Sequence, residues 1–330
     1  MMTENQALGF AIPTYRRPQL LDRALHSIVP QASAFGLPIY ICDDSCDQTN
    51  ELAIKKWQTE YPGIIHEINE RNLGIDRNID RAVTRCPSRF VHVLGEDDVI
   101  FPGFAEAALA QIATGDPAHI ICSYLYLSND FEPISNRAVI PPDVAGSSLR
   151  MFLPRYGWAL GFIGANIFNR ARYSAGGLDG YGTYFHHLVR IITTVEPDET
   201  VGLIKAPLVG NRADDESTAS WTGDRINVVF GIEAALSASM QGRYSAAEIS
   251  RSVSAARTHL GYAQTARLLY WAHLSEQEGK GQGYWDSLSR YLPDDRCNRL
   301  KSTPGFVKIL LAKMFPLLRS AKRTLRKRGE

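Results

Sequence analysis

Short apolar runs alternate with amphipathic segments along the first 130 residues of the chain. Each run has the length of a buried strand, and in the segments between runs the apolar residues recur at the spacing of a helix. Strands that alternate with helices are typical of a parallel sheet covered by crossover helices. The pattern therefore predicts an α/β fold, with strands at 8–12, 39–42, 64–68, 90–94 and 119–125 and helices after residue 18 and at 51–60, 75–83 and 104–112. Pro13 is expected to end the first strand.

The pattern changes beyond residue 130. A Pro-rich stretch at 134–143 predicts a loop or a boundary, and the mixed, Gly-rich region that follows contains one more predicted strand at 201–204. Helical periodicity dominates from 224 to 291, without a strand signal. We therefore expect an α/β part at 1–222, divided near residue 130, a helical region at 223–304 and a separate tail at 305–330.

The charges are unevenly distributed along the chain. Lys and Arg number 36 and Asp and Glu number 35, so the formal net charge is only +1. Residues 305–330 hold eight of the basic side chains and one acid, which leaves 28 basic and 34 acidic side chains in residues 1–304. A nucleic-acid-binding protein would need a basic stripe on the fold itself. An acidic body with a basic tail therefore argues against nucleic acid as a partner.

The cysteines and the N-terminus suggest a cytosolic protein. Five cysteines are widely spread and mostly lie in apolar stretches, which is typical of buried, reduced thiols: Cys42, Cys46, Cys86, Cys122 and Cys297. They show no zinc-binding spacing. The first seven residues do not resemble a signal peptide, and no apolar stretch reaches the roughly 20 residues that a membrane span needs.

Three adjacent acids follow the predicted strand at 90–94. Glu96, Asp97 and Asp98 repel one another, and a divalent cation or a metal bound to phosphate would neutralise them. Taken alone, the cluster is explained better as a solvated turn that caps the helix after Pro102.

A second acidic pair makes a ligand site more credible. Asp43 and Asp44 also follow a predicted strand, so both acidic segments are expected at one edge of the sheet, where open α/β sheets bind ligands. One pair can accept hydrogen bonds from a pyrimidine or a ribose while the other holds a cation on a diphosphate. An Asx turn is the alternative for Asp43, Asp44 and Ser45.

Four segments, in this order and spacing, resemble the family 2 glycosyltransferases. They are IPTYRR at 12–17, ICDDSCDQT at 41–49, NLG at 72–74 with Asn78, and LGEDD at 94–98 with Pro102 and Gly103. Four such segments are far more specific than a single Asp-x-Asp. The resemblance is firm over roughly residues 8–125 and thin beyond them.

The resemblance implies a GT-A fold, a Rossmann-like nucleotide-sugar-binding α/β domain, here with a mostly helical C-terminal part. It implies that residues 1–222 form this domain, with a nucleotide-sugar half at 1–130 and an acceptor half at 131–222. It also implies a nucleotide-diphosphate-sugar donor, a Mn²⁺ or Mg²⁺ ion and, usually, an inverting displacement. A divalent ion suits this reaction, because a Lewis acid stabilises the departing diphosphate.

Carried over by position, the resemblance assigns roles to individual residues. Asp44 would contact the base, Asp97 the ribose and Asp98 the metal. Glu96 replaces the family's first Asp with a longer side chain, which argues against a direct metal contact. Arg77 is either a diphosphate contact or an exposed helix residue. The implied nucleotide-sugar residues are Pro13, Thr14, Tyr15, Arg17, Asp43, Asp44, Asn72, Gly74, Arg77, Asn78, Glu96, Asp97 and Arg212, and the implied metal ligands are Asp98 and Asp97.

The general base that inversion requires is harder to find. Relatives usually supply an Asp in an acidic motif shortly before an Arg, but here the region at 176–190 has no acid at that place, although Arg190 is present. His186 and His187 are the nearest ionisable replacements, and imidazole is a competent base near neutral pH. Each is equally well explained as a packed or solvent-exposed residue. Asp179 is the second candidate, although an Asp at this position is often structural in the family.

The segment NRADDEST at 211–218 resembles the polar loop that many relatives fold over the donor. Arg212 is a candidate diphosphate contact, and Asp214 and Asp215 are further candidates for the base. A solvated charged loop explains each acid better when it is taken singly. Trp158 and Trp221 are candidates to stack on sugar rings, but most tryptophans are core residues.

The tail at 305–330 interleaves apolar and basic residues and contains Pro316. Such a segment can lie on an anionic membrane, where each basic residue contributes about 1 kcal/mol. Docking of its apolar residues on the body of the protein is the alternative.

These observations predict a metal-dependent, inverting glycosyltransferase. We expect it to transfer a sugar to a hydroxyl of a lipid-linked oligosaccharide, at the cytoplasmic face of a bacterial membrane. It resembles transferases that build O-antigen or similar surface polysaccharides, including the abequosyltransferase-like group. Two alternatives stay open. A nucleotidyltransferase would need a Gly-rich triphosphate loop that the segment at 14–18 does not provide, and a non-catalytic binding protein would explain the missing acidic base.

Overall fold

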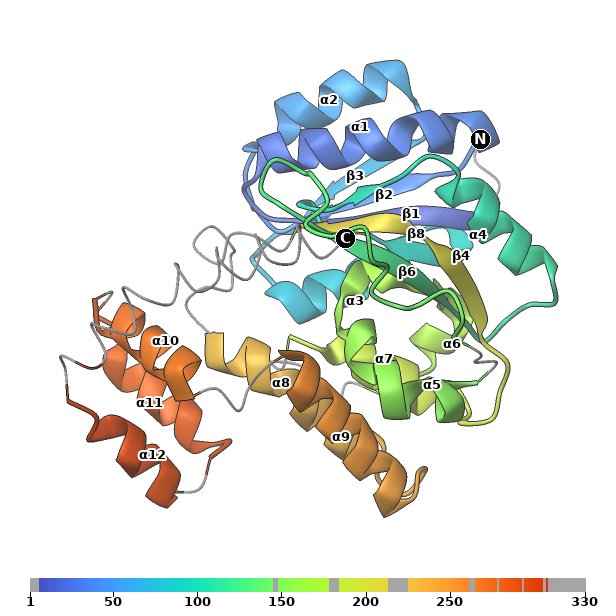
Figure 1. Ribbon diagram of the computed structural model, residues 1–330. Helices are drawn as coiled ribbons and strands as arrows, with labels where there is room; N and C mark the ends of the chain where they lie inside the picture. Colours follow the sequence, from blue (N-terminus) through green and yellow to red (C-terminus); the bar gives the residue numbers. More distant parts are fainter. Residues whose placement is uncertain are drawn as a thin grey trace.

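The centre of the structure is a mixed β-sheet (Figure 1). The computed structural model describes residues 6–144, 148–177, 184–212, 225–260, 265–277, 279–292, 294–304 and 307. Within these ranges the sheet has eight strands in the order β3-β2-β1-β4-β7-β6-β8-β5. Their bounds are β1 Gln6–Thr14, β2 Ile39–Asp43, β3 Ile64–Ile68, β4 Ser88–Val93, β5 Val99–Ile100, β6 His119–Leu127, β7 Asn166–Asn169 and β8 Gly202–Arg212.

The first four strands of this order pair in parallel, as the sequence predicts. β7 then runs antiparallel to both β4 and β6, β8 is parallel to β6, and β5 is antiparallel to β8. The central strand β1 buries Leu8, Phe10 and Ile12 completely. A strand that is covered on both faces is expected to be a continuous apolar run, which is the pattern that makes it recognisable in the sequence.

Helices cover both faces of the sheet. Figure 1 shows α1 and α2 on one side and α3, α6 and α7 on the other. In the first half the bounds are α1 Pro18–Phe35, α2 Glu51–Glu60, α3 Ile75–Arg85 and α4 Phe104–Ala113. In the second half they are α5 Leu149–Tyr156, the 3₁₀ turns η1 Gly157–Gly161 and η2 Ile163–Ala165, α6 Arg170–Ser174 and α7 His186–Thr194.

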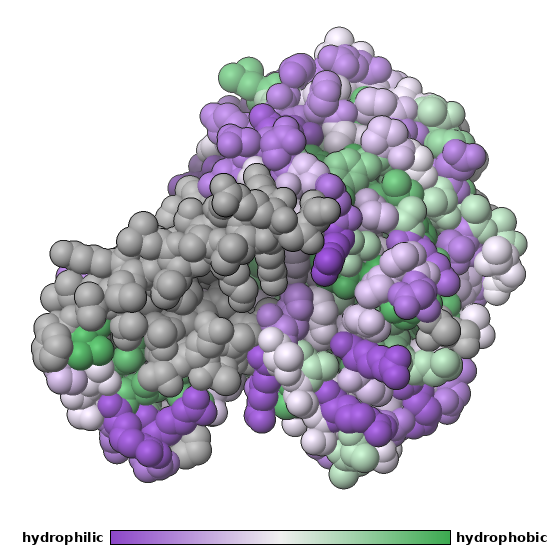
Figure 2. Space-filling view, in the orientation of Figure 1, coloured by the Kyte–Doolittle hydropathy of each residue, from purple (hydrophilic) through white to green (hydrophobic). Residues whose placement is uncertain are grey.

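The C-terminal region is helical, as predicted. It comprises α8 Arg225–Ser239, α9 Ala246–Leu260, α10 Thr265–Gln277, α11 Gly281–Ser289 and α12 Asp294–Lys301, and the described residues between 225 and 304 contain no strand. Helix α9 packs against α5 and η1, whereas α10, α11 and α12 form a separate group (Figure 1). Figure 2 shows a hydrophilic surface over α12, which exposes acidic and basic side chains. The domain boundaries at 130, 222 and 304 stay predictions.

The predicted strands and helices of the first 130 residues are all present, but Pro13 does not end the first strand. β1 continues through Pro13 to Thr14, and β2 runs alongside it to Asp43. The carbonyl of Ala11 faces β4, where it accepts a hydrogen bond from Leu94 N. Pro13 faces the same side, because neighbouring residues of a strand alternate in direction. β4 ends at Val93, so the missing N–H of Pro13 removes no hydrogen bond from the sheet.

Two short strands, β5 and β7, were not predicted. β5 has two residues and β7 has four, of which the first and the last are Asn. Such segments are too short to show periodicity. Both are held by their neighbours in the sheet, so only the tertiary structure makes them strands. The cysteines behave as expected: all five are free thiols, and four of them are buried, Cys46 being exposed.

Three buried histidines hold the segment that joins η1 to β7. His92 of β4, His119 of β6 and His187 of α7 each donate a hydrogen bond from Nε2 to this segment. The acceptors are Gly164 O at 3.0 Å, Asn166 Oδ1 at 3.1 Å and Gly161 O at 3.2 Å, respectively. Burial lowers the pKa of each imidazole to about 4. The segment is thus fixed by neutral rings that resist protonation.

These histidines predict that the fold loses stability in mild acid. Their pKa of about 4 in the folded protein lies below the ordinary 6.5, so between these values the unfolded chain binds more protons. The free energy of unfolding should therefore fall as the pH drops from 6.5 towards 4. Urea denaturation at several pH values in this range measures the slope.

His92→Gln provides the control for this prediction, because Gln can donate to Gly164 O but does not titrate. This variant should show a weaker dependence of unfolding free energy on pH than the unmodified chain. An unchanged slope would mean that His92 does not contribute.

Candidate functional site

Polar side chains gather where β1, β2 and β4 end. β1 ends at Thr14 and β2 ends at Asp43, while the turn after β4 carries Glu96, Asp97 and Asp98. In open α/β sheets, ligands bind in the crevice at the carboxyl ends of the strands. We call the side chains gathered here the carboxyl-edge site: Thr14, Arg17, Asp43, Asp44, Glu96, Asp97, Asp98 and Arg212.

Glu96 is turned into the protein. Its Oε2 accepts hydrogen bonds from the Thr14 hydroxyl and from Tyr15 N, the latter at 2.8 Å, and Arg17 Nε lies 3.6 Å from Oε1. Burial raises the pKa of Glu96 to about 8, against the opposing effect of these hydrogen bonds, and the charge of Asp97 adds to the rise. Glu96 therefore holds the end of β1 in place, which agrees with the expectation that it makes no direct metal contact.

Asp97 lies between two arginines. Its Oδ2 is 3.2 Å from Arg17 Nη1 and 3.9 Å from Arg212 Nη2. The side chain is 27% exposed, more than that of Glu96 at 9%, so it is the better placed of the two to meet a ligand. The two guanidinium groups come from segments that are far apart in the sequence: Arg17 follows β1, and Arg212 is the last residue of β8.

Asp98 is buried beneath this turn. Its Oδ1 accepts a hydrogen bond from Arg212 N at 3.0 Å, which joins the end of β8 to the acidic turn. A side chain at position 95 would place its Cβ only 2.6 Å from Asp98 Oδ2, so Gly95 is what allows the turn to fold back on itself. Burial and the neighbouring charge of Asp97 raise the pKa of Asp98 above its ordinary range.

Asp97 and Asp98 fit the metal that the family pattern implies. A buried carboxylate with a raised pKa gains most from a nearby cation. Among the described residues, no three His, Cys, Asp or Glu side chains converge on one point. Mg²⁺ commonly needs only one or two carboxylates when substrate phosphates and water complete its shell. Asp98, with Asp97 beside it, would hold the ion in this way.

The carboxylate of Asp43 is occupied by hydrogen bonds to neighbouring residues of the fold. It accepts hydrogen bonds from Ser45 N at 2.9 Å and from Asn50 Nδ2 at 3.1 Å, and His66 Nε2 lies 3.3 Å away. Burial raises the pKa of Asp43, but the hydrogen bonds from His66, Ser45 and Asn50 outweigh it and hold the pKa below the ordinary value. The bond to Ser45 N is an Asx turn, which was the alternative for this segment.

Asp44 organises the loop that begins α3. Its carboxylate accepts hydrogen bonds from Leu73 N at 2.8 and 3.0 Å, from Gly74 N at 3.0 Å and from Asn69 Nδ2 at 3.0 Å. Gly74 has φ of +79°, a conformation that disfavours other residues. These bonds occupy both oxygens of a side chain that is only 3% exposed. The predicted contact between Asp44 and the base stays a prediction, while its role in the loop is observed.

The remaining predicted residues lie around this loop and the end of β1. Asn78 is buried and donates to Cys42 O at 3.2 Å and to Thr14 O at 3.4 Å, so it joins α3 to two strands. The others lie nearer the surface: Tyr15, Asn72, Gly74 and Arg77 are exposed and Pro13 is partly buried. These residues are accessible to a ligand, whereas Asn78 is structural.

The start of α7 is held by an acid from α3. Asp76 accepts hydrogen bonds from Tyr184 N at 3.1 Å and from His186 N at 3.2 Å, and thus satisfies N–H groups at this helix end. One turn further along α3, Asp80 Oδ1 lies 3.2 Å from Arg190 Nη2. The second half of the molecule is therefore attached to α3 at two points.

His186 and His187 are both buried, at 0% and 2% exposure. His186 Nε2 accepts a hydrogen bond from Arg190 Nε at 3.0 Å, and His187 Nε2 donates to Gly161 O. Both rings therefore have structural contacts and neither is open to solvent in this structure. The assignment of either ring as general base stays a prediction. Asp179, Asp214, Asp215, Trp221 and the tail after 307 lie outside the described residues.

Sequence reasoning missed Asp76 and Asp80, although a signal was present. They are four residues apart on α3, and two like charges at this spacing destabilise an isolated helix. Such a pair indicates partners outside the helix, which the structure identifies on α7. The side chains that bind Asp43 and Asp44 at the end of β2 are Asn50, Asn69 and His66. The sequence gives no comparable signal for these three residues.

Solved structures with the same architecture define the fold. S. aureus TarS 1-349, in complex with UDP-GlcNAc, has a TM-score of 0.58 at 13% identity, over 98% of this chain and 91% of that one. The mannosyltransferase PcManGT from Pyrobaculum calidifontis, in complex with GDP-Man and Mn²⁺, has a TM-score of 0.52 at 14% identity, over 94% and 87%. The fold is thus of the GT-A type, as predicted.

The sequence comparisons identify the family. The model of Glycosyl transferase family 2 matches residues 10–170, so these residues form a domain of that family, and the chain is a glycosyltransferase. The abequosyltransferase RfbV from Salmonella typhimurium is 29% identical over 64% of this chain and 68% of its own length. The uncharacterized glycosyltransferase MJ1057 from Methanocaldococcus jannaschii is 24% identical over 37% of this chain and 43% of its own.

The attachment of α7 to α3 predicts a large effect of Asp80→Asn. Arg190 is 5% exposed, and removing the charge of Asp80 leaves this buried guanidinium without the carboxylate that lies 3.2 Å from it. The unfolding free energy should fall by about 3 kcal/mol in urea denaturation.

Asp116→Asn is the matched control, because Asp116 pairs with Arg89 at 3.7 Å on the surface. That variant should lose less than about 1 kcal/mol. Equal losses in the two variants would contradict the importance of the α3–α7 contact.

Proposed function

We propose that this glycosyltransferase transfers a sugar from a nucleotide-diphosphate-sugar to a hydroxyl of a lipid-linked oligosaccharide, with inversion at the anomeric carbon. The observation that carries the proposal is the alternation of charge at the carboxyl-edge site. Asp97 lies between Arg17 and Arg212, directly beside the buried Asp98. A diphosphate requires cationic groups around it, while a ribose and a divalent metal require carboxylates.

The solved neighbours support the donor class. TarS was crystallised with UDP-GlcNAc, and PcManGT with GDP-Man and Mn²⁺. We propose that Thr14, Tyr15 and Arg17 line the nucleotide pocket, with Asp44 near the base and Asp97 near the ribose. Asn72, Gly74 and Arg77 lie on the loop and helix that follow, where an exposed Arg suits a diphosphate.

The charged side chains then have separate tasks in the transfer reaction. Asp98 and Asp97 would hold a Mn²⁺ or Mg²⁺ ion, which would supply Lewis-acid stabilisation of the departing diphosphate. Arg17 and Arg212 add positive charge beside the same group, which is worth most where water is excluded. Glu96 and Asp43 keep the ends of β1 and β2 in position. Because these side chains are already oriented before the reaction, no free energy is needed to orient them in the transition state.

The name of RfbV, an abequosyltransferase, supports a role in building O-antigen or a similar surface polysaccharide. We propose an acceptor that is attached to lipid, reached from the cytoplasmic face of the membrane with the basic tail at 305–330 on the anionic surface. Among the helices that the structure describes, none is long and apolar enough to cross a membrane.

Asp98→Asn tests the metal site. The variant should release nucleoside diphosphate at least about a hundredfold more slowly in the presence of Mn²⁺, because the leaving group loses its electrostatic support. UDP-, GDP-, CDP- and dTDP-sugars should be compared as donors, with Asp116→Asn as the control. Full turnover by Asp98→Asn would show that the metal assignment is wrong. No release from any donor by the unmodified chain would favour a non-catalytic binding protein.

The general base is tested by three single substitutions: Asp179→Asn, His186→Asn and His187→Asn. Loss of the base should slow transfer by about a hundredfold or more, while nucleotide binding measured by calorimetry is retained. For the two buried histidines, urea denaturation must accompany the assay, since a variant that unfolds gives no information on the base. Normal transfer by all three folded variants would exclude these residues and direct attention to Asp214 and Asp215.

A further inference from the structure

A second hollow lies away from the carboxyl-edge site, between α9 and the α5–η1 segment. It has a volume of about 480 Å³, which is enough for a sugar or a phosphate group. The residues that line it are Pro154, Arg155, Trp158, Arg251, Ser254, Ala255, Thr258 and His259. We call it the α9 hollow.

The side of α9 that faces this hollow is polar. Its lining residues lie at positions 251, 254, 255, 258 and 259, which is the spacing of a single helix face. A helix usually turns an apolar face towards its neighbour. Here that face carries a guanidinium, two hydroxyls and an imidazole, and the last of these stacks on Trp158. Arg251, Ser254 and Thr258 stay exposed at the edge of the contact between α9 and α5, where a polar ligand can reach them.

The hollow has two arginines without partners. Arg155 and Arg251 are exposed, and neither forms an ion pair or a side-chain hydrogen bond with any residue in the described parts of the chain. Among the residues that the structure describes, no Asp or Glu lines the hollow. By contrast, the nearby Arg150 is bound by both Asp198 and Glu248, at 2.7 and 2.9 Å. Two unneutralised guanidinium groups around one hollow favour an anion, and phosphate is the group that such forks bind best.

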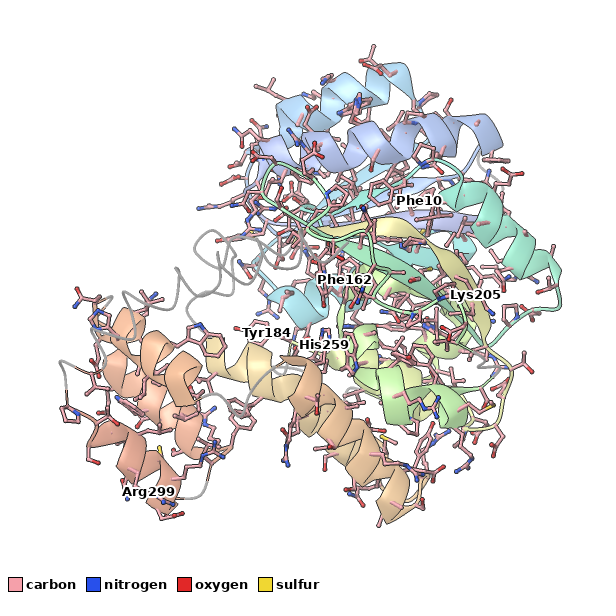
Figure 3. All side chains as sticks on the ribbon, in the orientation of Figure 1. Phe10, Phe162, Tyr184, Lys205, His259 and Arg299 are labelled. Carbon is pink, nitrogen blue, oxygen red and sulfur yellow. The ribbon has the colours of Figure 1, made fainter. Side chains whose placement is uncertain are left out.

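Aromatic rings connect the hollow to the carboxyl edge of the sheet. The rings of Trp158 and His259 are stacked, with centroids 3.2 Å apart and planes within 14° of parallel. His259 Nε2 is 3.1 Å from the hydroxyl of Tyr126, near the end of β6. Figure 3 shows His259 on the side of α9 that is directed towards Phe162 and the sheet.

The strand pairing completes this connection. β6 ends beside β8, where Leu127 pairs with Arg212, the residue whose N–H binds Asp98. The α9 hollow is therefore joined to the carboxyl-edge site through the last residues of two adjacent strands. A group bound in the hollow would contact residues 154–158, which lie in the predicted acceptor half, as well as α9.

We propose that the α9 hollow binds a phosphate-bearing carbohydrate, with Arg155 and Arg251 on the phosphate and the Trp158–His259 stack beside a sugar ring. Aromatic rings offer an apolar face to such a ring while their edges stay polar. This inference rests on the proposed function and deepens it: the ligand is the phosphate-linked sugar of the acceptor.

The test compares two double variants that remove equal charge. Arg155→Gln with Arg251→Gln removes the guanidinium groups of the hollow, whereas Arg137→Gln with Arg290→Gln removes two exposed guanidinium groups elsewhere. Calorimetry with glucose 1-phosphate and with inorganic diphosphate should show affinity roughly tenfold lower in the first double variant only. Both double variants keep the donor site, and only the first changes the α9 hollow. The difference in affinity between them therefore reports binding in the hollow alone.

His259→Ala separates the sugar from the phosphate. It should weaken binding of glucose 1-phosphate and leave inorganic diphosphate unchanged, since only the sugar uses the ring stack. Vesicles of phosphatidylglycerol and phosphatidylcholine provide the other source of phosphate. If the hollow variant loses vesicle binding but keeps both soluble probes, the arginines contact lipid headgroups and the proposal is wrong. Equal affinities of the two double variants for the soluble probes would also overturn it.

Measuring donor hydrolysis in the same variants distinguishes a failure of this proposal from a failure of the proposed function. Release of nucleoside diphosphate with Mn²⁺ should be the same in the hollow variant and in the control. If the unmodified chain releases none, the proposed function fails, while the calorimetric comparison still decides whether the hollow binds a phosphorylated sugar.

Discussion

The carboxylate of Asp44 fixes the start of α3, and much of the molecule depends on where that helix begins. By accepting hydrogen bonds from Leu73 N and Gly74 N, it makes the loop turn directly after the end of β2. α3 then carries Asn78 beneath two strands and presents Asp76 and Asp80 to α7. One buried side chain thus sets the position of the helix that joins β1 and β2 to α7.

The acidic residues of the site divide into two groups by burial and by hydrogen bonding. Asp43, Asp44 and Glu96 each accept two or more hydrogen bonds from backbone and side-chain donors, so they hold the strand ends and the loop before α3. The carboxylate of Asp98 is as deeply buried, but within the described residues it accepts a hydrogen bond from Arg212 N alone, and Asp97 lies partly exposed beside two arginines. Asp97 and Asp98 are therefore the pair that we propose to meet the ligand.

The family motifs predicted which residues gather at the carboxyl edge, but not what each of them does. The motif around Asp43 and Asp44 was recognisable because it follows a buried strand. Its hydrogen bonds come from Asn50, Asn69 and the loop at 72–74, which lie elsewhere in the chain and show no periodic signal. The same holds for His186 and His187, whose neighbours in sequence do not reveal that both are buried.

The sequence alone determined the parallel half of the sheet, its helices, the helical C-terminal region and the glycosyltransferase family, because buried strands and amphipathic helices leave regular patterns and the family motifs are contiguous. Only the tertiary structure decided that β5 and β7 are strands, that Pro13 lies inside β1 and that α7 is capped by Asp76. It also decided that Arg155 and Arg251 face one hollow. These features depend on contacts between residues far apart in the chain, and such contacts leave no local pattern.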